Sequence, residues 1–154
     1  MHGWDPLTPI EETLRFLDDA VRAGKIHYIG LSNFTGWQLQ LAVSTARALG
    51  LAVPVTLQPQ YSLVSREIEY EISPAALYNG LGLLPWSPLA SGFLTGKYQQ
   101  DATPPSGARM GSDSAFYSRT LRLLAAKQQN WDTLDAVRDI ADTVGASPSQ
   151  VALS

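Results

Sequence analysis

Residues 24–34 read GKIHYIGLSNF, and this stretch decides the fold that the sequence predicts. Gly24 ends a preceding helical pattern, and residues 26–31 are rich in β-branched, aromatic and apolar types, as expected of a buried strand. Ser32 and Asn33 follow at once and begin a polar loop. The stretch therefore predicts a short buried strand whose end carries polar side chains.

The same unit of strand and helix returns twice further along the chain. Strands are expected at 26–31, 54–58 and 82–86, so their starts step by 28 residues, from 26 to 54 and from 54 to 82. Apolar periodicity predicts helices at 8–24, 35–50, 67–78, 114–128 and 131–144. A constant step of this kind predicts a βα repeat with right-handed crossovers and a parallel sheet.

Capping-box sequences support the helix starts expected at Thr8 and Ser147. Thr8 stands three residues before Glu11, with Pro9 suited to the first helical position. Ser147 stands three residues before Gln150 in the same way. We expect both side-chain pairs to cap the helices that follow them.

Composition bounds the class of protein. The chain has 154 residues, of which 45% are hydrophobic, so one domain with a sizeable core is expected. The net charge is only −3 and the basic residues are scattered, which argues against nucleic-acid and membrane partners and favours a small molecule. The absence of cysteine excludes disulfides and cysteine zinc sites, and with two histidines no histidine-rich metal site is expected. No apolar run approaches the roughly 20 residues of a membrane span, so we expect a cytoplasmic protein.

Both ends of the chain look incomplete for such a repeat. Three parallel strands alone leave two open edges. Residues 2–5 resemble a loop that follows a strand, yet no strand precedes them, and the helix expected from Ser147 stops at Ser154. We therefore expect residues 1–154 to form a single partial domain, cut at both ends, whose exposed sheet edges make an oligomer possible.

Polar residues stand at the end of every expected strand. They are Ser32 and Asn33 after the first strand, residues 58–62 after the second, and Trp86 with Ser87 after the third; His2 holds the matching place before the first helix. In βα barrels the loops after successive strands converge at one face, where the active site lies. The long segment from 92 to 111, with Pro and Gly at 104–107, is expected at that face as well.

Each residue type also allows an ordinary structural interpretation. Asn33 and Ser62 are typical turn residues, and Trp86 equally fits a core position. His2 equally fits an exposed residue near the chain start. Position in the repeat favours the functional interpretation, and the residue types alone leave the choice open.

Four strings carry a resemblance to a known family. They are PIEETL at 9–14, GKIHYIGLSNF at 24–34, QPQYS at 58–62 and WSPLASGFLTGKY at 86–98. In this order they resemble the aldo-keto reductases, in the bacterial branch that also resembles potassium-channel β-subunits. The resemblance implies an α/β fold, a partial (β/α)8 TIM barrel from about the end of strand 4 through the helices after strand 7.

The resemblance also implies a chemistry. Family members reduce aldehydes or ketones by hydride transfer from NADP(H), with a histidine, a tyrosine, a lysine and an aspartate in the active site. His2 matches the histidine that orients the carbonyl group. The other three would lie upstream, so the chain on its own is expected to be inactive.

Residues expected to hold the cofactor follow from the same resemblance. The carboxamide partners are Ser32, Asn33 and Gln58, and Trp86 stacks on the nicotinamide ring. The loop around the pyrophosphate is Ser87, Pro88, Leu89, Ala90 and Ser91, followed by Lys97 and by Arg109 at the adenosine phosphate. By residue type alone Lys97 and Arg109 are solvated surface charges. Trp4 and Tyr61 are expected to line the substrate pocket.

Three hypotheses follow. The first is a portion of an NADP(H)-dependent carbonyl reductase, which the strings favour most. The second is a non-catalytic subunit that binds the nicotinamide cofactor and acts as a sensor or regulator. The third is a structural half-barrel that pairs with a copy of itself. Which aldehyde or ketone would be the substrate is not encoded in these residues.

Overall fold

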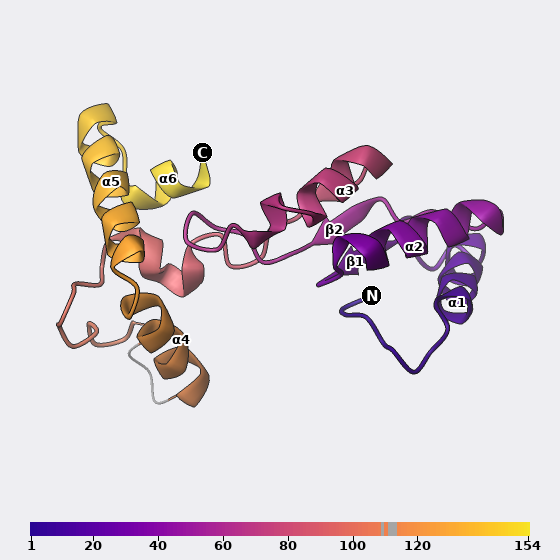
Figure 1. Ribbon diagram of the computed structural model, residues 1–154, viewed down its shortest axis with the longest axis horizontal. Helices are drawn as coiled ribbons and strands as arrows, with labels where there is room; N and C mark the ends of the chain where they lie inside the picture. The colour runs from indigo at the N-terminus through magenta and orange to yellow at the C-terminus, as the bar shows by residue number, and fades with distance from the viewer. Residues whose placement is uncertain (109, 111–113) are drawn as a thin grey trace. The chain divides into compact units, whose positions relative to one another are not determined.

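The computed structural model describes residues 1–108, 110 and 114–154 (Figure 1). They divide into two compact units, the first made of residues 1–60 and 67–86 and the second of residues 61–66 and 87–154. The elements of the first unit are α1 (Ile10–Arg22), β1 (Gly30–Ser32), α2 (Gly36–Ala48), β2 (Thr56–Gln58), the 3-10 helix η1 (Glu67–Glu69), α3 (Ile72–Asn79) and β3 (Gly82–Leu83).

A small parallel sheet organises the first unit. The strand order is β1-β2-β3, and Gly30 pairs with Thr56, which pairs with Gly82. The predicted parallel sheet is confirmed, with a register step of 26 residues, from 30 to 56 and from 56 to 82. The α-helices of this unit pack side by side, because α2 contacts both α1 and α3.

The first strand is shorter than the sequence predicts. Of the expected residues 26–31 only Gly30 and Leu31 belong to β1, which runs on to Ser32. The N–H groups of Lys25 and Ile26 donate to the Ala20 carbonyl at the end of α1, so the chain is still closing that helix where a strand was expected. The side chains of His27 and Tyr28 are then exposed to solvent.

The third strand also ends early, yet its pairing continues. β3 stops at Leu83, but the Leu84 N–H donates to the Leu57 carbonyl at 2.9 Å. The Trp86 N–H donates to the Pro59 carbonyl at 2.9 Å. The backbone up to Trp86 therefore follows the neighbouring segment in parallel, as the expected strand at 82–86 requires.

The prediction of one helix over 67–78 was wrong. The segment holds η1 and then α3, with Glu71 between them in a non-helical conformation. Pro74 gives the reason, since inside a longer helix it would remove a hydrogen bond and clash with the preceding turn. Beginning α3 at Ile72 puts Pro74 in the first turn, where its missing N–H costs nothing.

The capping boxes predicted at Thr8 and Ser147 had different outcomes. Ser147 and Gln150 cap α6 (Pro148–Leu153) as expected, with the Ser147 N–H donating to Gln150 Oε1 at 2.8 Å. At α1 the expectation was wrong, because the cap residue is Pro9 and has no side-chain hydrogen bond. Thr8 Oγ1 instead donates to Asp5 Oδ2 at 2.7 Å.

The core of the first unit lies between the sheet and its helices. Leu31 and Leu57 from neighbouring strands are almost fully buried, and so are Leu14 of α1 and Leu39 of α2. Gly80 ends α3 with a positive φ of 73°, a conformation that costs glycine little. This turn returns the chain to the sheet at β3.

The second unit is mainly helical. It holds the 3-10 helix η2 (Ala90–Thr95), α4 (Ala115–Ala125), α5 (Gln128–Val144) and α6. Ser91 and Gly92 interrupt η2 with a non-helical backbone, and the longer loop expected from residue 92 continues after Thr95. Phe93 and Trp131 form the centre of the core, with ring centroids 4.8 Å apart. Among the described residues, no helix has both the length and the apolar character needed to cross a membrane.

Asp18 ties α1 to the segment before β2. Its carboxylate is buried, accepts a hydrogen bond from Arg22 Nε, and accepts a second from the Ala52 N–H at 2.8 Å. These hydrogen bonds, the one from Arg22 first and the one from Ala52 second, hold the pKa of Asp18 below its ordinary value. The folded state therefore favours the ionised carboxylate.

Replacing Asp18 with Asn should lower the midpoint of thermal unfolding by a few degrees at neutral pH. Because the folded-state pKa is lowered, this stabilisation is present above the unfolded carboxyl pKa of about 3.9 and is lost as the pH falls through the folded value. Calorimetry across pH should show the gap between the two proteins closing in acid. The exposed Asp19→Asn is the control, and a gap that persists unchanged in acid would contradict the assignment.

Candidate active site

The carboxyl edge of the first unit brings together the polar residues expected there. Ser32 Oγ donates to the Gln58 carbonyl at 2.9 Å, and the Asn33 N–H reaches the same oxygen at 3.2 Å. Trp86 Nε1 donates to Asn33 Oδ1 at 2.9 Å. Residues from the ends of all three strands thus contact one another in one unit.

Asn33 connects three segments through one amide. Its Oδ1 accepts from the Trp86 indole, and its Nδ2 donates to the His2 carbonyl at 3.1 Å. The orientation of the amide is fixed by chemistry, because an indole N–H only donates and a carbonyl only accepts. Asn33 has a φ of 57°, in the left-handed region that asparagine tolerates better than most residues.

A pocket of about 340 Å³ opens beside this edge. Its lining is formed by Met1, His2, Gly30, Leu31, Ser32, Thr56, Gln58 and Leu84. The Gln58 side chain is exposed and, among the described residues, its amide has no protein partner, so it can donate and accept at once. Met1, Gly30, Leu31, Thr56 and Leu84 had not been expected in the site, and the expected step of 28 residues would have paired Gly30 with Gln58 instead of Thr56.

His2 and Asp5 lie close in sequence but have different surroundings. The His2 side chain is exposed and lines the pocket. Asp5 accepts hydrogen bonds from Thr8 Oγ1 and the Leu7 N–H, the two contacts that lower its pKa, the larger effect coming from Thr8. An ionised turn-forming carboxylate of this kind is a poor proton donor.

Trp4 packs among other aromatic rings. Its ring centroid lies 5.5 Å from that of Phe34 and 5.4 Å from that of Trp37, both in edge-to-face geometry. The ring is partly buried. By contrast the Trp86 side chain is 38% exposed, so Trp86 is not a core residue. The core interpretation of Trp86 was therefore wrong.

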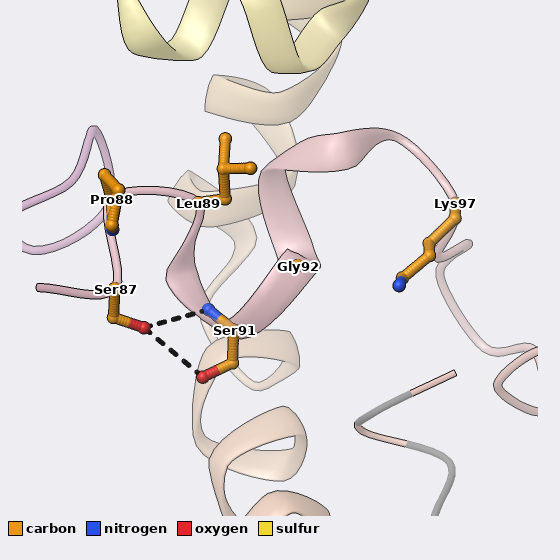
Figure 2. Close-up of a pocket in the computed structure, with 6 residues that line it drawn as sticks. All are labelled: Ser87, Pro88, Leu89, Ser91, Gly92 and Lys97. Atoms are coloured by element: carbon orange, nitrogen blue, oxygen red, sulfur yellow. Dashed lines mark hydrogen bonds between the residues drawn. The ribbon is translucent and has the colours of Figure 1, made fainter. Parts of the chain in front are cut away.

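A second pocket, of about 350 Å³, lies in the second unit (Figure 2). It is lined by Ser87, Pro88, Leu89, Ser91, Gly92 and Lys97. The Ser91 N–H donates to Ser87 Oγ at 3.1 Å, and the two hydroxyl oxygens are 3.4 Å apart. The N–H groups of Ala90 and Gly92 donate to carbonyls of the same loop. The loop therefore presents mainly hydroxyl groups and one ammonium group to a ligand.

Lys97 lies over the glycine of this loop. A Cβ placed on Gly92 would come 3.3 Å from Lys97 Nζ, so the absence of a side chain at 92 lets the ammonium approach the loop. Lys97 is exposed, and its Nζ is 5.4 Å from the centroid of the Tyr98 ring. Among the described residues no carboxylate pairs with Lys97, so its charge is available to an anion. Gly92 had not been expected in the site.

The remaining expected residues have varied surroundings. Tyr61 is partly buried in the second unit. Ser62 is buried and exchanges two backbone hydrogen bonds with Ser65, which supports its interpretation as a turn residue. Arg109 lies outside the described residues.

Comparisons with known proteins identify the family of the chain. The model of the Aldo/keto reductase family matches residues 1–154. A probable voltage-gated potassium channel subunit beta from Oryza sativa subsp. japonica is 38% identical over 99% of this chain and 46% of its own length. Versiconal hemiacetal acetate reductase of Aspergillus parasiticus is 33% identical over 100% of this chain and 43% of its own. Aflatoxin B1 aldehyde reductase member 2 of Mus musculus is 30% identical over 93% and 39%. The chain spans less than half the length of these relatives.

Substitutions at Asn33 should separate its amide from its backbone conformation. Asn33→Gly removes both side-chain hydrogen bonds but keeps the positive φ accessible, whereas Asn33→Ala must also adopt a strained conformation. We expect Asn33→Ala to be less stable than Asn33→Gly by about 1 kcal/mol, measured by urea unfolding. Equal free energies of unfolding would show that the left-handed conformation is not maintained.

Proposed function

Since the chain belongs to the aldo/keto reductase family, we propose that it is the cofactor-holding portion of an NADP(H)-dependent enzyme that reduces aldehydes or ketones to alcohols. The observation that carries the proposal is the group of Ser32, Asn33, Gln58 and Trp86 at one edge of the parallel sheet. In this proposal residues 1–154 are one section of a (β/α)8 barrel, from the end of its fourth strand through the helices after its seventh.

The first-unit pocket has the donor set that a nicotinamide carboxamide requires. A carboxamide needs both a donor and an acceptor, and the exposed Gln58 amide offers both. The Ser32 hydroxyl lines the same pocket. Trp86 is held by Asn33 with its ring partly exposed, as a stacking surface must be. We assign Ser32, Asn33, Gln58 and Trp86 to the nicotinamide end of the cofactor.

The second-unit pocket has the character of a phosphate site. It combines the hydroxyls of Ser87 and Ser91 with the Lys97 ammonium. All three groups can donate hydrogen bonds to phosphate oxygens. The lack of a side chain at Gly92 keeps the space under Lys97 open. We assign the loop of Ser87, Pro88, Leu89, Ala90 and Ser91, with Lys97, to the pyrophosphate. Arg109 is assigned to the adenosine phosphate on resemblance alone, as is the preference for NADP(H).

His2 is the residue that we assign to the substrate. A reduced nicotinamide, when bound, supplies a hydride to the carbonyl carbon. The exposed imidazole of His2 can donate a hydrogen bond to the carbonyl oxygen as negative charge develops there. We propose that Trp4 and Tyr61 contact the rest of the substrate. The proton donor and the lysine and aspartate that tune it belong, in this proposal, to the part of the barrel outside this chain.

A second candidate function is a non-catalytic subunit that binds the cofactor. The similarity to proteins described as probable voltage-gated potassium channel subunit beta favours it. Both candidates require the nicotinamide site, so cofactor binding tests the shared part of the proposal. Turnover separates the two candidates only in a protein that contains the complete set of catalytic residues.

Trp86→Leu should weaken NADPH binding by about two- to twelvefold, because stacking of aromatic rings contributes about 0.5–1.5 kcal/mol. Titration of nicotinamide fluorescence with the purified chain measures the dissociation constant. Trp37→Leu is the matched control, since Trp37 is 56% exposed and lies outside both pockets. Unchanged nicotinamide fluorescence at millimolar NADPH with the unmodified chain would refute the cofactor assignment.

The chain alone should oxidise NADPH no faster than buffer does when a simple aldehyde is supplied. The loss of general acid catalysis by itself costs a factor of about 10² to 10⁴. Absorbance of NADPH followed over hours measures the rate. Turnover of about 1 s⁻¹ or more, usual for a complete enzyme, would show that this chain holds its own proton donor.

A further inference from the structure

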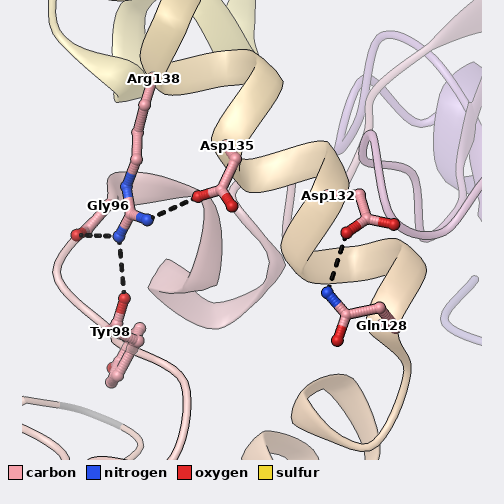
Figure 3. A network of polar contacts seen from close by, with 6 residues as sticks. All are labelled: Gly96, Tyr98, Gln128, Asp132, Asp135 and Arg138. Carbon is pink, nitrogen blue, oxygen red and sulfur yellow. Dashed lines mark hydrogen bonds and ion pairs between the residues drawn. The ribbon is translucent and has the colours of Figure 1, made fainter.

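Arg138 of α5 binds the backbone on both sides of Lys97 (Figure 3). Its Nη2 donates to the Gly96 carbonyl and to the Tyr98 carbonyl, each at 3.0 Å. Its Nη1 donates to Asp135 Oδ1, one turn earlier on the helix, at 2.9 Å. The Arg138 guanidinium therefore holds the backbone of residues 96–98 against α5.

These contacts fix the backbone from which the Lys97 side chain extends. Gly96 has a φ of 82°, and the Tyr98 ring is buried in the core of the second unit. Between these anchored neighbours the Lys97 side chain extends toward Gly92, as Figure 2 shows. A lysine on a free loop would lose more conformational entropy when it binds an anion.

The geometry suits arginine in particular. A planar guanidinium can reach two carbonyls and a carboxylate at once, whereas a lysine ammonium is a single point of contact. Asp135 is largely exposed, so its ion pair with Arg138 contributes little to the position of the guanidinium. Arg138 is absent from the lining of the phosphate pocket, so it acts on a ligand through Lys97.

We propose that Arg138 is a positioning residue for the phosphate site, holding the Lys97 ammonium over Gly92 by fixing the carbonyls of Gly96 and Tyr98. This inference rests on the proposed function of the second-unit pocket. It adds Arg138, which stands 41 positions after Lys97 in the sequence, as a residue that determines phosphate affinity.

A double-mutant cycle with inorganic pyrophosphate as the probe tests the proposal. Isothermal titration calorimetry is done on the full chain and on Lys97→Ala, Arg138→Ala and the double variant. We expect Arg138→Ala to weaken binding about tenfold, equivalent to about 1.4 kcal/mol. The double variant should bind no more weakly than Lys97→Ala alone, because Arg138 acts through Lys97. A purely structural or long-range electrostatic role would instead make the two losses multiply.

Two further variants complete the design. Asp135→Asn keeps the contacts of Arg138 with the carbonyls and should bind pyrophosphate within about twofold of the unmodified chain. If Arg138→Ala does not fold, as thermal unfolding will show, Arg138→Lys keeps the charge but reaches fewer acceptors, and it should give a smaller loss that again disappears in the Lys97→Ala background.

The outcomes distinguish the positioning role of Arg138 from the phosphate assignment on which it rests. If the unmodified chain does not bind pyrophosphate, the phosphate assignment is refuted, and the proposed role of Arg138 is refuted with it. Pyrophosphate binding that Lys97→Ala weakens and Arg138→Ala leaves unchanged overturns the positioning role alone. Losses that multiply in the double variant overturn it as well.

Discussion

The parallel register that pairs Gly30 with Thr56 and Thr56 with Gly82 is the constraint on which the first unit depends. Side chains alternate across a strand, so a shift of one residue would turn Leu31 and Leu57 out of the core. Gly30 permits the close pairing, since a Cβ there would lie 2.6 Å from Thr56 Oγ1. With this register in place, the polar ends of the strands arrive at one edge.

The site at that edge is organised by an amide more than by a charge. Asn33 accepts a hydrogen bond from the indole of Trp86, 53 residues later in the sequence, and donates one to the carbonyl of His2, 31 residues earlier. Each neutral hydrogen bond contributes only about 1 kcal/mol, so these bonds orient the groups more than they stabilise the fold. The partly exposed Trp86 indole is therefore held in one direction, whereas the exposed Gln58 amide keeps its donor and acceptor groups available.

Local patterns in the sequence were sufficient for the parts of the fold that depend on local chemistry. The helix capped by Ser147 and the polar strand ends were predicted, because periodicity and caps act over a few residues. The parallel sheet was predicted from the repeat of strand and helix along the chain. The break at Glu71 was missed although Pro74 signalled it. The contacts of Arg138 with Gly96 and Tyr98 were beyond prediction, since they depend on how α5 packs and on no pattern near either segment.

The loop of residues 87–92, to which we assign the pyrophosphate, shows why strained residues can persist beside a pocket. Ser87, Ala90 and Ser91 all have φ near 50°, a conformation that costs a non-glycine residue about 1 kcal/mol or more. Burial of Ala90, Phe93 and Leu94 in the core of the second unit holds the loop in this shape. Glycine at position 91 would relieve the strain, but it would also remove a hydroxyl from the pocket. Serine in a conformation that suits glycine is best explained by the chemistry of its side chain.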